Sequence, residues 1–158
     1  MNKMKLMLIP LLLLLCSVVV VSTASLATVN APIMWRLELE EVTPDIDWIT
    51  DTLALQVFEQ DGDVYDGEDD IGDITMQVRF LLDTDRLQGH ANVKFNMTIG
   101  EDELTGVMNG KIWYEDPNLE HQLIKGRFVA NGAYHVHGTV TNLATPVENN
   151  ILLQGVRH

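Results

Sequence analysis

Residues 91–99 read Ala91-Asn-Val93-Lys-Phe95-Asn-Met97-Thr-Ile99, in which apolar and polar side chains alternate without a break. Because successive side chains of a strand point to opposite faces, this period of two indicates a β-strand with one apolar and one polar face. Residues 74–82 repeat the pattern, and residues 35–40 and 53–57 carry shorter copies of it. The sequence therefore predicts many strands and almost no helix.

Four further candidate strands lie at about residues 105–115, 122–130, 133–143 and 150–156, separated by turn-forming segments. About eight strands in one domain predict an all-β, antiparallel β-sandwich or, alternatively, a jelly roll or a closed β-barrel. We favour the sandwich because residues 59–73 and 143–150 resemble crossovers at the ends of a sandwich. The one helical signal is short, at residues 43–49, where Thr43 suits the N-cap and Pro44 the first turn.

The first 27 residues have the composition of a secretory signal peptide. Two lysines precede an apolar run at residues 6–21, and small residues follow it. Signal peptidase requires small side chains next to the cleavage point, so we expect cleavage after Ala24 or Ala27 and a single secreted β-domain at residues 28–158. The alternative is that the apolar run is retained as a membrane anchor.

The composition is strongly acidic, with 23 Asp and Glu against 10 Lys and Arg and a formal net charge of −13. Nucleic acid binding requires a basic face, so this balance argues against a nucleic acid partner. Attraction to anionic lipid is equally disfavoured, and we expect membrane contact only through bridging calcium. Cys16 is the single cysteine. It lies in the signal region, so the exported domain depends on packing, bound metal or assembly instead of disulfides.

The largest charge excess lies in residues 59–73, where eight carboxylates and no Lys or Arg fall within fifteen residues. We expect this stretch to form a loop between two strands. Carboxylates this close repel one another unless water or a cation separates them, and a set of oxygen ligands suits calcium. The stretch therefore predicts a Ca²⁺ site.

Residues 53–76 also resemble part of a known family. An alternating strand leads into Asp61-Gly-Asp63, followed by five residues and then Asp69-Asp70-Ile71-Gly72, which opens the next strand. This segment resembles the third calcium-binding loop of the calcium- and lipid-binding domain of protein kinase C and the synaptotagmins. The resemblance covers about two dozen residues.

The resemblance implies calcium ligands at Asp61, Asp63 and Asp69. Side chains two apart in an extended loop point the same way, so the first two can hold one ion while Asp69 closes the cage from the far side of the loop. Asp66 and Asp70 are further candidate ligands.

Two other features are open to functional interpretation. His135 and His137 share one face of a strand, and their simplest interpretation is that both face water. Asn96 begins an Asn-Met-Thr glycosylation sequon on the polar side of its strand. No serine elbow, surviving cysteine or glycine-rich phosphate loop indicates catalysis.

We therefore expect an exported, non-catalytic calcium-binding β-domain at the cell surface or in the extracellular matrix, acting in adhesion or assembly. Its partner is expected to be another copy of itself or another surface protein. In a filament or sheath, residues 28–42 or 150–156 could act as donor strands that complete the sheet of a neighbouring copy. The alternatives are a calcium-dependent membrane-binding module and a secreted β-barrel enzyme or small-ligand carrier.

Overall fold

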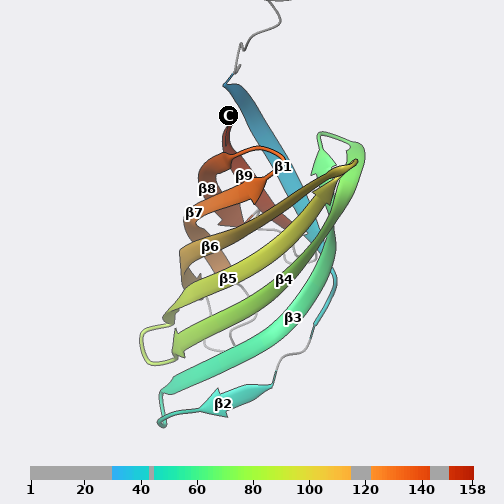
Figure 1. The fold of residues 1–158 in the computed structure, drawn as a ribbon. Coiled ribbons are helices and arrows are strands. Elements are labelled where there is room, and N and C mark those ends of the chain that lie inside the picture. The colour runs from blue at the N-terminus through green and yellow to red at the C-terminus, as the bar shows by residue number, and fades with distance from the viewer. Residues whose placement is uncertain (1–29, 43–44, 115–121, 143–149) are drawn as a thin grey trace, which may run out of the picture.

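A computed structural model describes residues 30–42, 45–114, 122–142 and 150–158. The described residues form strands joined by turns, with no helix among them (Figure 1). The strands are β1 (Ala31–Leu39), β2 (Ile46–Trp48), β3 (Leu53–Asp66), β4 (Asp69–Asp83), β5 (Gln88–Ile99), β6 (Asp102–Tyr114), β7 (Gln122–Gly132), β8 (Val136–Asn142) and β9 (Asn150–Arg157).

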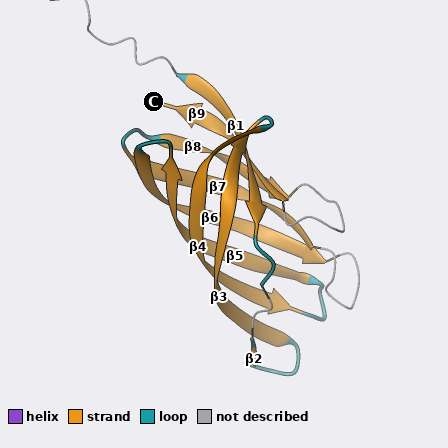
Figure 2. Cartoon of the chain, turned by 90° about the vertical axis from the view of Figure 1, so that its right-hand side faces the viewer, coloured by secondary structure: helices purple, strands orange, loops and turns teal. Residues whose placement is uncertain are grey.

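The sheet is antiparallel and closes on itself, because β1 pairs with β9 on one side and with β3 on the other. Eight strands, β1 and β3 to β9, make the closed β-barrel, and Figure 2 shows β1 beside β9. The prediction of an all-β antiparallel domain of about eight strands is confirmed. The architecture is the barrel that we named as an alternative, and the β1–β3 pairing is what excludes two separate sheets.

The short β2 strand lies outside the barrel and pairs with the first part of β3, through Ile46 opposite Gln56 and Trp48 opposite Ala54. The prediction of a helix at residues 43–49 is therefore wrong for residues 45–49, which the structure describes. Its proposed capping residues, 43 and 44, lie outside the described residues, as does the expected signal segment at residues 1–27. No helix in the described part of the chain has the length and apolar character needed to cross a membrane.

The barrel interior is packed with apolar side chains from every barrel strand. The alternating residues of β4 and β5 point inward, as predicted from their period of two. The least exposed large side chains are Leu37, Val64, Ile74, Met76, Leu82, Met97, Leu104, Ile112, Val136 and Leu153. Each of these is at most 2% exposed, so together they form an apolar core inside the barrel.

The acidic stretch does not form a loop, in contrast to our expectation. β3 and β4 remain paired up to Asp66 and Asp69, so only Gly67 and Glu68 make the turn between them. Gly67 has a φ of +67°, a left-handed conformation that suits glycine in a two-residue hairpin. Residues 59–73 thus form the two arms of a β-hairpin, which we call the acidic hairpin.

Both expected donor segments are already paired within the single chain. β1 forms a long antiparallel ladder with β9, from Ala31 opposite Arg157 to Glu38 opposite Asn150. β9 also pairs with β8, and β1 also pairs with β3. The start of β1 and the C-terminus therefore lie at the same end of the barrel (Figure 1).

Candidate functional site

A row of carboxylates crosses the outer face of three neighbouring strands. Glu38 on β1 lies directly opposite Asp63 on β3, and Asp63 lies directly opposite Asp73 on β4. The row continues through Thr98 on β5 to Glu103 on β6. Directly opposed side chains in a sheet have Cβ atoms about 4.5–5.5 Å apart, so these like charges repel one another across the strands. We call Glu38, Asp63 and Asp73 the acidic row.

The five predicted calcium ligands do not share one face of the acidic hairpin. Asp61 and Asp63 point outward from β3, as expected for residues two apart. Asp70 lies opposite Tyr65 on the same side, whereas Asp66 and Asp69 face each other beside the turn on the opposite side.

The cage of Asp61, Asp63 and Asp69 is therefore not assembled. Asp69 pairs with Asp66, which is three residues beyond Asp63 on β3, so Asp69 lies about 10 Å further along the hairpin than Asp63. Its side chain also points to the other face of the hairpin. Among the residues that the structure describes, no three His, Cys, Asp or Glu side chains are arranged to hold a metal ion. The residues that the sequence reasoning missed are Glu38 and Asp73.

Asp70 has a structural role at a β-bulge in β4. Val64 pairs with Gly72 while Tyr65 pairs with Asp70, so one extra residue is accommodated between them. The Asp70 carboxylate accepts a hydrogen bond from the Gly72 backbone N–H at 3.2 Å, which stabilises the bulge. A side chain on Gly72 would overlap the backbone carbonyl of Thr98, so the approach of β4 to β5 at this point requires glycine.

Tyr65 and Arg36 lie beside the acidic row. The Arg36 guanidinium lies 4.8 Å from the centre of the Tyr65 ring and forms a 3.0 Å ion pair with Glu38. Partial burial raises the pKa of Tyr65 above its ordinary value of about 10. The carboxylates of Glu38, Asp63 and Asp70 add to this rise in pKa, and Arg36 opposes it. Two carboxylates of the acidic row, Glu38 and Asp63, thus help to keep the Tyr65 phenol in its neutral form.

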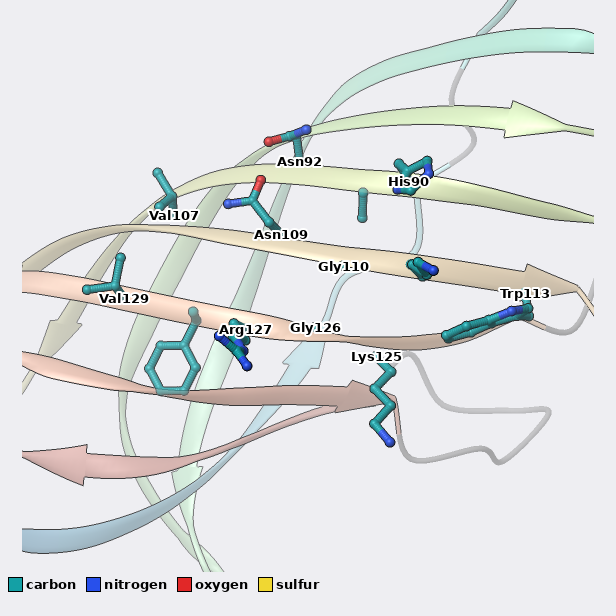
Figure 3. A pocket seen from close by; sticks show the side chains of 13 residues that line it. His90, Asn92, Val107, Asn109, Gly110, Trp113, Lys125, Gly126, Arg127 and Val129 are labelled. Carbon is teal, nitrogen blue, oxygen red and sulfur yellow. The ribbon is translucent and has the colours of Figure 1, made fainter.

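A second charged surface, of opposite sign, lies on the outer face of β5, β6 and β7. It is an open groove of about 900 Å³. Val107 and Val129 lie at one end, Asn92, Asn109 and Arg127 in the middle, and Trp113 and Lys125 at the other end (Figure 3). We call it the basic groove, and its charged or polar side chains are His90, Asn92, Asn109, Lys111, Lys125 and Arg127.

Small residues of the inner face lie beneath this groove. Ala91, Gly110 and Gly126 lie directly opposite one another on the three strands. A side chain on Gly126 would overlap the carbonyl oxygen of Asn109, so β6 and β7 approach more closely here than a larger residue would permit. The glycines beneath the groove therefore allow β6 and β7 to lie close together.

The two predicted water-facing histidines join a third at the end of the barrel. His137 is exposed and stacks on His158, with ring centres 5.1 Å apart and planes within 7°. His135 is half-buried, and its Nδ1 lies 2.7 Å from the side-chain oxygen of Asn131. Asn96, the sequon residue, is exposed on the outer face of β5.

Comparison with protein-family models and with curated proteins finds no match to this chain. The two charged surfaces of the barrel, the acidic hairpin and the basic groove, are the features from which a function can be argued.

Proposed function

We propose that this protein is an exported, non-catalytic β-barrel that binds calcium on its acidic hairpin and acts in adhesion or assembly at the cell surface or in the extracellular matrix. The observation that carries this proposal is the acidic row, in which the register of three adjacent strands sets Glu38, Asp63 and Asp73 side by side. Hard cations such as Ca²⁺ prefer carboxylate oxygens, and a bound ion would cancel the repulsion within the row.

The ligand set of this proposal is revised from the sequence prediction. Asp63 is retained from the original five residues, with Asp61 next to it on the same face. Glu38 and Asp73 replace Asp69, because they flank Asp63 on the neighbouring strands while Asp69 points away. Binding requires side-chain rotations, including release of Glu38 from its ion pair with Arg36.

Calcium titration by calorimetry tests this proposal. We expect saturable heat for the wild type and its loss in Asp63→Asn and Asp73→Asn. Asp69→Asn should keep the heat because its side chain lies on the other face, and this variant separates the revised ligand set from the predicted one.

Asp47→Asn is the matched control, since Asp47 is an exposed strand residue opposite Leu55 and away from other carboxylates across the strands. Wild-type heat in both row variants would refute the proposed site.

A further inference from the structure

We propose that the basic groove binds the acidic hairpin of a second copy of the protein, so that the molecules associate head to tail, and that calcium on the hairpin releases the contact. The inference deepens the assembly part of the proposed function by naming the partner and the surfaces. The contact itself does not require calcium binding, so the two ideas can fail separately.

The groove brings three cationic side chains together on two neighbouring strands. Lys111 on β6 and Lys125 on β7 are directly opposite each other, and Arg127 lies two residues further along β7. Like charges in direct opposition destabilise a sheet. Within the described part of the chain, none of these three side chains forms an ion pair. An external carboxylate would therefore relieve repulsion and gain a charge-assisted hydrogen bond.

The acidic hairpin supplies the complementary chemistry. Residues 59–73 hold eight carboxylates and no cation, and residues 66–70 at the turn are all exposed. The groove contains three of the ten Lys and Arg residues of a chain whose net charge is −13. Opposite potentials on two surfaces of one protein favour contact between copies over contact between identical surfaces.

The groove also offers apolar area for such a contact. Trp113 is 38% exposed and Val107 is 40% exposed, at opposite ends of the groove. Trp and Arg are the residues most enriched among those that dominate binding energy at protein interfaces. On the hairpin, the half-buried ring of Tyr65 is the aromatic side chain that can meet them.

The two surfaces lie on different strands, so one molecule offers both at once. The acidic row lies on β1, β3 and β4, and the groove lies on β5, β6 and β7. A contact between unlike surfaces is heterologous, and it produces a ring or an open filament depending on whether the rotation closes. Calcium would bind the same carboxylates that the groove needs, so its binding and head-to-tail association compete.

Charge reversal and mixing test the contact. In chelator at low salt we expect the average mass of the wild type, from analytical ultracentrifugation, to rise with concentration. The groove variant Lys111→Glu/Lys125→Glu and the hairpin variant Asp63→Lys/Asp73→Lys should each remain monomeric. An equimolar mixture of the two should associate again, because each surface then meets a partner of opposite charge.

The control variant is Arg86→Glu. Arg86 is a cation in the β4–β5 turn, outside the groove, so this variant should associate like the wild type. Circular dichroism checks that every variant is folded. Calcium at millimolar concentration, and separately 1 M salt, should return the wild type to monomer.

A wild type that stays monomeric in chelator, or a groove variant that associates like the wild type, would overturn the inference. Binding of polygalacturonate to the groove, by a protein that remains monomeric, would also overturn it, since the occupant would then be an acidic polysaccharide. If the wild type associates in chelator but shows no heat of calcium binding, the proposed calcium site is refuted while the head-to-tail contact is supported.

Discussion

Replacement of Asp63 by Asn should change stability in opposite directions with and without calcium. Asp63 is flanked across the strands by Asp73 and Glu38. At about 5.5 Å in water, each pair of unit charges repels by about 0.75 kcal/mol. Because Arg36 partly neutralises Glu38 through their 3.0 Å ion pair, the relief on substitution lies between about 0.7 and 1.5 kcal/mol.

The assay is urea unfolding of wild type and Asp63→Asn at low protein concentration. In chelator at low salt the variant should be more stable by that amount, and in 1 M salt the difference should nearly vanish as the Debye length falls to about 3 Å. With calcium at one hundred times its Kd, the wild type should gain about 2.7 kcal/mol and become the more stable protein.

Asp47→Asn serves as the control, and it should show neither effect. If Asp63→Asn is less stable than the wild type in chelator, or if calcium stabilises both proteins equally, the acidic row is not the source of repulsion and calcium affinity that we infer.

Four further predictions concern the barrel itself. Ile112→Ala should lower the free energy of unfolding by about 2–5 kcal/mol in urea titrations, because the side chain is fully buried and leaves a cavity. Gly126→Ala should cost about 1–3 kcal/mol and shift the amide resonances of β6 and β7, because the new methyl group overlaps a carbonyl of the adjacent strand. In Gly67→Ala the new methyl group meets no other atom, so the free energy of unfolding should fall by only about 1–2 kcal/mol, because alanine disfavours the positive φ of this position. The pKa of Tyr65 is raised in the folded state, so the tyrosine of the unfolded chain ionises first as the pH rises. The free energy of unfolding should therefore fall as the pH rises above about 10. In urea titrations at high pH, Tyr65→Phe should weaken that fall.

Much of the fold could be predicted because inward and outward positions alternate along the chain. The pattern at residues 91–99 identified the strand that the structure shows as β5, and Gly100, which has a positive φ, lies in the turn that follows it. The same chemistry recurs at Asp66-Gly67-Glu68, where glycine again has a positive φ and glutamate follows it. Aspartate followed by glycine between alternating strands is a strong hairpin signal, so the acidic hairpin was within reach of the sequence.

The candidate site was less accessible to sequence reasoning, because it depends on pairings between distant segments. Glu38 joins Asp63 only through the contact of β1 with β3 that closes the barrel. The opposition of Lys111 and Lys125 depends on the register of β6 with β7, whose connection at residues 115–121 lies outside the described residues. A one-residue shift in either register would turn every side chain of the shifted strand to the other face.

The charge on the acidic hairpin is separable from its folding. Val64 and Ile74 point into the core and are 0% and 1% exposed, while Asp63 and Asp73 point outward beside them. The inward residues supply the burial that holds the hairpin in place, so the outward positions could carry neutral residues without loss of the fold. Carboxylates there weaken the isolated protein by repulsion, and the cations of the basic groove likewise oppose one another across the strands. Both penalties disappear when each surface meets an opposite charge, which is why we interpret the two surfaces as binding sites.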